Sequence, residues 1–415
     1  MCYNTRMDFI YGETATTADY VRLIDSARVY DVARVTSLDR MRRLSDALGA
    51  NVCLKREDTQ EVHSFKIRGA YNKMCRLPKD DLARGVLAAS AGNHAQGVAL
   101  SAKMLGTCAT IVMPETTPRL KIDEVESYGA RIVLKGETYS DAAEEAKRLV
   151  AEKGLTFIPP YDDPEVIAGQ GTVAREILEQ CPSVGSVFVP IGGGGFAAGV
   201  SVYVKGVKPS VKVYGVEPDD SDCMARSIEA GRPVTVERPG LFADGVCVKR
   251  PGEETFRICR ACLDGIVRVS VSETCKAMED VFAATRTVCE PAGALALAAL
   301  KKTVKRGETA AAIVSGANMN FISLCFVSSD SLLARIRDDI LADGRIDVDE
   351  ARRVLKMIDV SFTPTEPCSR LIGLLRESVS FGTVTAEQSR NIARAIDETI
   401  NFSMTTAEER RMLMG

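Results

Sequence analysis

The chain has 415 residues, 46% of them hydrophobic and 26% charged, which is enough for two or three domains with well-packed cores. A net charge of −3, with both signs interspersed, argues against nucleic-acid binding, and no apolar run approaches the length of a membrane span. Thirteen cysteines without framework spacing favour reduced thiols, and the N-terminus lacks the pattern of a signal or transit peptide, so we expect a cytoplasmic protein.

Short runs rich in β-branched residues alternate with helix-like segments through the first three quarters of the chain. Several of these runs are continuously apolar, as strands buried on both faces are. The alternation predicts βαβ units, parallel sheets and right-handed crossovers. The expected strands are 52–55, 86–90, 109–114, 131–134, 187–191, 211–216, 266–271 and 311–314.

The first segment with recognisable chemistry contains Lys66 between Phe65 and Ile67. A lysine amine can condense with an aldehyde cofactor and can serve as a base once the substrate has displaced it. Most lysines are solvated surface cations, but the apolar neighbours of Lys66 and the nearby Gly69 set it apart. We therefore predict that Lys66 is the catalytic residue.

A second segment joins a predicted strand to a helix rich in alanine and glycine. The first N–H groups of such a helix lack acceptors and suit a carboxylate, and an ordinary loop between strand and helix is the equal alternative. The predicted substrate-binding residues are Ser90, Ala91, Gly92, Asn93 and His94. The chain has only two histidines, His63 and His94, and we interpret both as shaping loops because Lys66 can transfer the proton itself.

Four consecutive glycines, Gly192, Gly193, Gly194 and Gly195, follow another predicted strand and allow backbone amides to close on a phosphate. The run lacks the lysine of a P-loop and the spacing of a dinucleotide fingerprint. Ser315 follows a further predicted strand and can bond a ring nitrogen. Ligands of parallel sheets bind beyond the carboxyl ends of the strands. Together with the lysine, these segments predict a site for pyridoxal 5'-phosphate (PLP).

Three segments contain residue types that can bind metals, but we predict no metal site. The pair Cys259 and Cys262 has no second pair to complete a zinc site. The acidic segment 217–222 could offer oxygen ligands, but a solvated loop is the simpler interpretation. Segment 343–347 lacks the ligand spacing of a calcium loop.

The pattern changes to helices only near residue 328. Segments 344–359 and 382–397 resemble each other at a spacing of 38 residues, and each contains a turn glycine followed by a capping box. The expected capping pairs are Asp347 with Glu350, Thr385 with Gln388, and Thr406 with Glu409. We predict a catalytic domain over 1–328, with a small subdomain at roughly 60–165 inserted in it, and an all-α domain over 329–415 with a two-fold internal repeat.

Several segments also resemble one family closely, from about Arg28 to about Asn320. These are 55–58, 64–70, 90–97, 159–162, 167–172, 242–246 and 290–295. They resemble fold-type II PLP enzymes, and among these most closely the biosynthetic threonine dehydratases (threonine ammonia-lyases). The resemblance implies an α/β, tryptophan synthase β-like fold with two open, twisted parallel-sheet subdomains.

The resemblance also assigns roles to the residues singled out above. It implies that Lys66 is the covalent attachment point of the cofactor, that Phe65 lies against it and that Asn93 bonds its ring hydroxyl. It places the phosphate on Gly192 to Gly195 and the pyridine nitrogen at Ser315. A neutral serine at that nitrogen makes the ring a weaker electron sink than a carboxylate partner would, which favours elimination.

The implied activity is that of a lyase. Elimination of water from L-threonine would give 2-oxobutanoate and ammonia, the first step of isoleucine biosynthesis, and L-serine would give pyruvate. The resemblance also implies a homo-oligomer, a dimer or a tetramer. The alternative is an activity like that of serine racemase or serine dehydratase. Racemases of this type use a second serine in the loop as a base, and here that position is Ala91, while the metal-binding loop after Glu217 is one residue short.

The C-terminal region departs from the family. Biosynthetic dehydratases usually end in ACT-like modules of βαββαβ type, and residues after 330 show no such strands. We therefore expect no feedback inhibition by isoleucine. An alternative role for the region is assembly or partner binding through apolar residues such as Leu371, Leu374 and Leu375, which could equally be buried against the catalytic domain.

Overall fold

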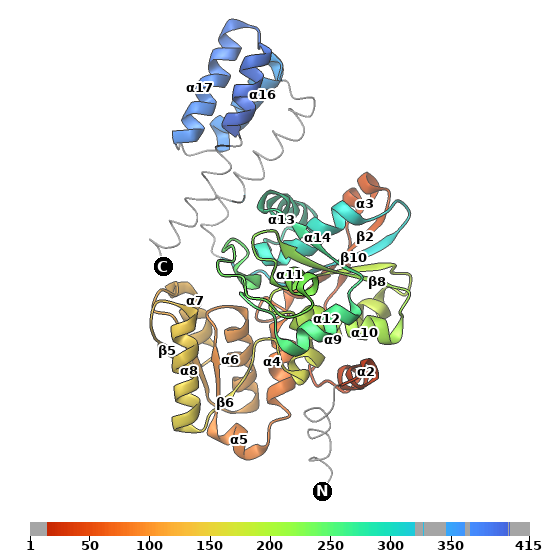
Figure 1. Ribbon diagram of the computed structural model, residues 1–415, viewed down its shortest axis with the longest axis vertical. Coiled ribbons are helices and arrows are strands. Elements are labelled where there is room, and N and C mark those ends of the chain that lie inside the picture. Colours follow the sequence, from red (N-terminus) through yellow and green to blue (C-terminus); the bar gives the residue numbers. More distant parts are fainter. Residues whose placement is uncertain (1–14, 320–326, 328–345, 362–365, 397, 399–415) are drawn as a thin grey trace.

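Two β-sheets organise the chain, as the computed structural model shows for residues 15–319, 327, 346–361, 366–396 and 398 (Figure 1). The larger sheet has six strands in the order β1-β2-β10-β7-β8-β9, and the smaller has four in the order β5-β4-β3-β6. Every strand pair in these sheets is parallel except β1 with β2. This arrangement confirms the predicted α/β fold with two parallel sheets.

The strands are β1 (Leu38–Arg40), β2 (Asn51–Arg56), β3 (Val86–Ala89), β4 (Ala109–Met113), β5 (Arg131–Leu134), β6 (Thr156–Phe157), β7 (Ser186–Pro190), β8 (Lys212–Pro218), β9 (Gly265–Val269) and β10 (Thr309–Val314). All eight predicted strands are confirmed to within two residues. The short strands β1 and β6 were not predicted. The smaller sheet lies between β2 and β7 in the sequence, so it interrupts the larger one.

The helices of the two-sheet region are α2 (Thr17–Asp25), α3 (Arg42–Leu48), α4 (Lys66–Met74), α5 (Lys79–Arg84), α6 (Asn93–Leu105), α7 (Arg119–Ser127), α8 (Tyr139–Lys153), α9 (Pro164–Gln180), α10 (Gly195–Val207), α11 (Cys223–Ala230), α12 (Glu253–Cys262), α13 (Val271–Thr285) and α14 (Pro291–Thr303). Two short 3-10 helices, η1 (Glu57–Thr59) and η2 (Asp244–Val246), complete it.

Both faces of the larger sheet are buried. In β10, Ala311 and Ile313 belong to an apolar cluster with α9 and α10, while Ala310 and Ala312 belong to a second cluster with α13 and α14. Alternate residues of a strand point to opposite faces of the sheet, so β10 needs apolar residues at odd and even positions alike. Its sequence is therefore continuously apolar rather than alternating.

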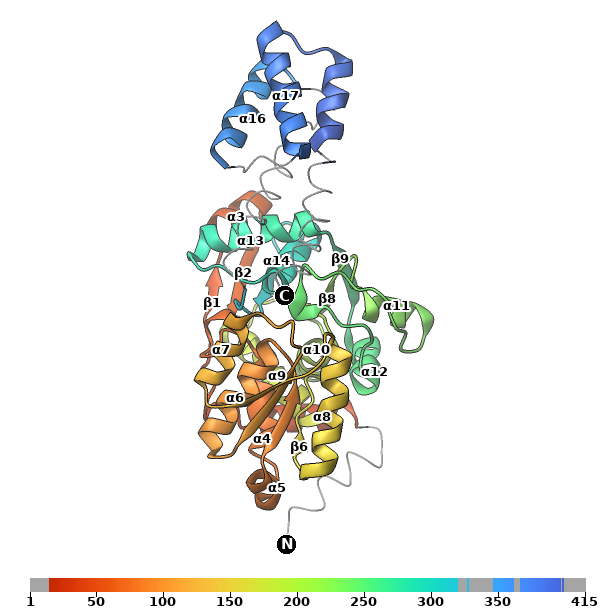
Figure 2. The same cartoon turned by 90° about the vertical axis from the view of Figure 1, so that its left-hand side faces the viewer.

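Glycines bring α4 close to α9 on one side and α6 on the other in the view of Figure 1, and Figure 2 shows the three helices one behind another. A Cβ at Gly69 would lie 2.8 Å from the carbonyl oxygen of Val166, and one at Gly169 would lie 2.6 Å from that of Arg68. On the other side, a Cβ at Gly97 would approach the carbonyl oxygen of Lys66 to 3.2 Å. The helix that begins at the predicted catalytic lysine is therefore tightly confined.

The C-terminal part contains α16 (Val348–Ser361), α17 (Glu366–Phe381) and a further helix at 386–396. Two predicted capping boxes are confirmed: Asp347 and Glu350 bond each other's backbone N–H groups at 2.7 and 2.9 Å, and Thr385 and Gln388 do so at 2.9 and 3.2 Å. The third predicted pair and most of segment 343–347 lie outside the described residues.

The apolar residues of this region form a core among themselves. Leu371 and Leu375 are fully buried in a cluster with Val354 and Ile392, and Leu374 packs against it. The expectation that the leucines of α17 need a partner chain or the catalytic domain to cover them is therefore wrong for Leu371 and Leu375, because the neighbouring helices already cover both side chains.

Candidate active site

The predicted site residues meet where strands of both sheets end. Ser90 follows β3, Gly192 lies just after β7, and Ser315 follows β10 directly. The backbone N–H of Phe65 donates to the carbonyl oxygen of Ser315 at 3.1 Å, and Ser64 forms a bridge with Gly316. The lysine segment is thus hydrogen-bonded to the residues that follow β10, although 250 residues separate Phe65 from Ser315 in the sequence.

Lys66 is the first residue of α4, and its amine is enclosed. The Nζ atom donates to the carbonyl oxygen of Pro160 at 2.8 Å and lies 5.4 Å from the centre of the Phe65 ring. Burial lowers the pKa of Lys66 to about 8, although the negative charge of Glu290 opposes the change. The amine is therefore much closer to its neutral, nucleophilic form near neutral pH than a surface lysine is.

Aromatic stacking joins the lysine segment to the glycine run. The rings of Phe65 and Phe196 stack with their centres 3.9 Å apart and an interplanar angle of 11°. Phe196 directly follows Gly195, the first residue of α10, and Gly194 adopts a φ of +96° that an L side chain rarely takes. The four glycines therefore lie at a helix N-terminus, where N–H groups without intrahelical acceptors favour an anion.

The loop from Ser90 to His94 leads into α6, which begins at Asn93. A Cβ at Gly92 would meet no atom within 4 Å, so the loop borders open space. The Nε2 of His94 lies 2.9 Å from the carbonyl oxygen of Ile158 and must carry the proton to bond it. Burial, with the charge of Lys66, lowers the pKa of His94 to about 3, so the ring is neutral and suits a structural role.

Glu290 is a member of the site to which the sequence analysis assigned no role. The Nδ2 of Asn93 donates to its Oε1 at 2.7 Å, and the Oδ1 of Asn93 accepts from Asn318 at 2.7 Å. Burial, followed by the charge of Asp244, raises the pKa of Glu290 to about 8. An acidic residue directly before a proline that begins an apolar helix was the available signal.

Unpaired polar atoms border the same region. Among the described residues, the Ser64 hydroxyl and the Gln96 amide oxygen are buried without a hydrogen-bond partner. Ser315 is buried and donates to the carbonyl oxygen of Ala292 at 3.2 Å, which leaves its lone pairs able to accept. An enclosed amine, an anion-binding helix end and unsatisfied polar groups fit an aldehyde cofactor that carries a phosphate.

The acidic segment 217–222 differs from the solvated loop expected from sequence. Glu217 is fully buried, and its carboxylate accepts from the backbone N–H groups of Met224 and Ala225, each at 2.9 Å. Asp222 is also buried and pairs with Arg226 and Arg268. Because these acids hold α11 and β9 in place, the solvated interpretation is wrong for both.

The fold and the site together define an enzyme of the fold-type II PLP class, with a buried lysine, a glycine loop at a helix N-terminus and the loop from Ser90 to His94. Residues 29–316 match the family described as pyridoxal-phosphate dependent enzyme. The chain belongs to this family.

A curated protein and two solved structures agree with that membership. The biosynthetic L-threonine dehydratase IlvA of Pasteurella multocida is 50% identical over 337 residues, which cover 80% of this chain and 66% of that protein. The structure of the processed form of threonine deaminase isoform 2 from Solanum lycopersicum is 43% identical, has a TM-score of 0.75 and covers 77% of this chain and 89% of that one. Maize serine racemase is 31% identical with a TM-score of 0.71, over 75% of this chain and 96% of its own. The chain spans about two thirds of the length of the curated relatives it matches, 66% for Pasteurella multocida and 64% for Escherichia coli.

Proposed function

We propose that this protein is a threonine dehydratase, a lyase that eliminates water from L-threonine and releases 2-oxobutanoate and ammonia. L-serine is the expected second substrate and gives pyruvate. The observation that carries the proposal is the enclosed amine of Lys66, held beside an open loop that suits a carboxylate. The named relatives support this choice of substrate, because dehydratases of threonine are prominent among them.

Each predicted residue has a place in this proposal. When bound, PLP supplies the electron sink that stabilises negative charge at the substrate α-carbon. Lys66 takes the α-proton on Nζ, which its lowered pKa permits near neutral pH. The loop from Ser90 to His94 binds the substrate carboxylate, Gly192 to Gly195 hold the phosphate, and Phe65 packs on the cofactor.

Asn93 and Ser315 complete the set. Asn93 is held by Glu290 and Asn318, and it would donate to the ring hydroxyl of bound PLP. Ser315 would bond the ring nitrogen, and a neutral hydroxyl there would not hold a proton on the ring, which favours elimination.

Racemisation of serine is the alternative, suggested by the similarity to maize serine racemase. It requires a second proton-exchanging group on the face of the substrate opposite Lys66. Ala91 has no exchangeable side-chain proton, and His94 uses its Nε2 proton to bond Ile158. These two residues favour elimination.

The remaining parts of the proposal concern the whole protein. We infer a catalytic domain over 1–328 with a small subdomain at roughly 60–165, and an all-α domain over 329–415. The separate apolar cluster of the C-terminal helices supports that division. No helix within the described residues is long and apolar enough to cross a membrane. We further propose a cytoplasmic homo-oligomer, a dimer or tetramer, that isoleucine does not inhibit.

The test is 2-oxo acid formation by purified, PLP-loaded protein given L-threonine, with and without isoleucine. We expect 2-oxobutanoate at a rate that isoleucine leaves unchanged, and no product from Lys66→Ala. Product from Lys66→Ala, or conversion of L-serine to D-serine without pyruvate, would overturn the assignment. Inhibition by isoleucine would overturn only the proposal about regulation.

A further inference from the structure

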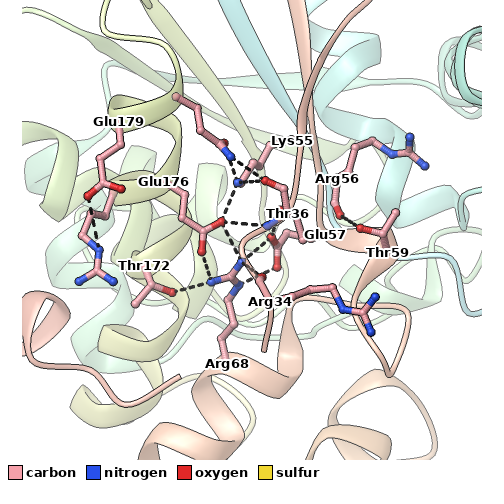
Figure 3. Close-up of polar contacts among 12 residues, drawn as sticks. Arg34, Thr36, Lys55, Arg56, Glu57, Thr59, Arg68, Thr172, Glu176 and Glu179 are labelled. Carbon is pink, nitrogen blue, oxygen red and sulfur yellow. Dashed lines mark hydrogen bonds and ion pairs between the residues drawn. The ribbon is translucent and has the colours of Figure 1, made fainter. Parts of the chain in front are cut away.

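A buried network of charged side chains surrounds Arg68, the third residue of α4 (Figure 3). Arg68 is fully buried, and its guanidinium bonds two carboxylates at once. It reaches both oxygens of Glu57 at 2.7 and 2.8 Å, and both oxygens of Glu176 at 2.6 and 3.1 Å. One arginine thereby ties α4 to η1 and to α9.

The network is balanced in charge and closed to solvent. Lys55, also fully buried, pairs with Glu176 at 2.6 Å, so two cations face two carboxylates. Burial opposes the charge of Arg68, but Glu57 and Glu176 outweigh it and raise the pKa of the guanidinium. The Thr36 hydroxyl donates to Glu57 at 2.6 Å, and the Thr172 hydroxyl accepts from Arg68 at 3.1 Å. Such a set holds its geometry only while every member is present.

Helix geometry links this network to the catalytic amine. Lys66 and Arg68 are two residues apart, so they project in directions about 200° apart around the axis of α4. A rotation of the helix by about 10° moves an atom at the outer radius, about 6 Å from the axis, by about 1 Å. A misplacement of about 1 Å can lower the rate of a reaction by about 100-fold.

We propose that Arg68 is a positioning residue, which fixes the rotation of α4 through Glu57 and Glu176 and so sets the position of the Lys66 amine. The inference rests on the proposed role of Lys66 as the cofactor-bearing lysine. Close glycine packing sets how near α4 lies to α9 and α6, and polar side-chain contacts restrain its rotation. Arg68 supplies the charged contacts nearest Lys66, with Glu57 and Glu176, while Asn72 and Lys73 bond Glu165 and Asp163 further along the helix.

The chain provides a matched control in Arg56. This residue lies between Lys55 and Glu57 and makes its own buried ion pair, with Asp58 at 2.7 Å. Figure 3 shows its guanidinium pointing away from the network, and its further contacts are with Asp39 and Thr287 rather than α4. Arg56→Lys and Arg68→Lys are therefore the same substitution in two buried pairs, of which only one contacts α4.

The experiment mixes each cofactor-free variant with PLP and follows attachment to Lys66 by the visible absorbance of the bound cofactor. Borohydride reduction and peptide mass spectrometry then give the fraction of Lys66 modified. We expect Arg68→Lys to slow attachment and to lower kcat for threonine by about 100-fold, with little change in KM, while Arg56→Lys stays close to the unaltered protein. Thermal midpoints should fall by similar amounts in both.

Equal attachment rates and equal kcat values in the two variants would overturn the proposal, whether both are normal or both are reduced. If Arg68→Lys does not fold, Glu57→Asp replaces it, because this change keeps the charge balance and withdraws the carboxylate by one methylene. If the unaltered protein attaches PLP but makes no 2-oxo acid, the proposed function fails, and the attachment rates still decide the role of Arg68.

Discussion

Burying a lysine amine at the site should weaken the cofactor-free protein in a pH-dependent way, and Lys66→Met measures how much. Each unit of pKa shift corresponds to about 1.4 kcal/mol. Lowering the pKa of Lys66 from 10.5 to about 8 therefore costs about 3 kcal/mol of stability at pH 7, where the unfolded chain binds the proton more tightly. Methionine avoids this cost but leaves the carbonyl oxygen of Pro160 without its donor, which costs about 1 kcal/mol.

The pH range over which buried Lys66 destabilises the folded protein follows from the direction of its pKa shift. Because the pKa is lower in the folded protein, the penalty is fully present below pH 8 and disappears as the pH rises through 10.5. The variant should be more stable than the unaltered protein by about 2 kcal/mol at pH 7 and less stable above about pH 10.

Urea unfolding of the cofactor-free proteins at several pH values tests this expectation, with the exposed Lys103→Met as control. A Lys66→Met advantage that does not change between pH 7 and 10 would refute the argument, because burial of a charge could not then be its cause. An equal effect of Lys103→Met would also refute it. Loss of turnover in Lys66→Met is expected in either case.

Two further predictions concern neighbours of Lys66. Burial raises the pKa of Glu290 from 4.5 to about 8, so the stability that this carboxyl group contributes is lost as the pH rises from about 5 to 8. The urea midpoint of Glu290→Gln should therefore fall less over that interval than the midpoint of the unaltered protein. An equal fall in both proteins would contradict this expectation. Gly69→Ala should destabilise the protein by about 1–3 kcal/mol because its Cβ would lie 2.8 Å from the carbonyl oxygen of Val166. Gly373→Ala in α17, where a Cβ would meet nothing within 4 Å, should instead stabilise by about 1 kcal/mol, and equal effects of the two substitutions would argue against the packing explanation.

The middle of the larger sheet was predictable because β7 and β10 are buried on both faces and are therefore almost continuously apolar. The strands β1 and β6 have three and two residues, too few for any periodicity to be visible. Their pairing depends on β2 and β3, which already provide an edge to which a short segment can bond. Tertiary context, rather than local preference, makes these two segments strands.

The site was predictable where the side chain itself carries the chemistry. Lys66 was predicted in this way, whereas the glycine run was predicted from the backbone freedom of glycine and the role of Asn93 from the resemblance to the family. The Pro160 carbonyl was not found, because a backbone acceptor has no sequence signature. Glu290 and Arg68 were missed for a different reason: their importance comes from burial beside particular partners, and a charged residue in a sequence is normally expected at the surface.

The strand order has a consequence for how the enzyme can be made. β10 lies between β2 and β7 in the larger sheet, yet among the strands that the structure describes it comes last in the sequence. During synthesis the smaller sheet is complete long before β10 leaves the ribosome, and until then the edges of β2 and β7 that will pair with β10 remain open to wrong pairing. Phe65 and Ser315 can bond only after that late strand has inserted. Chains that stop short of it therefore contain Lys66 without an assembled site, so we expect premature termination to yield inactive and aggregation-prone fragments.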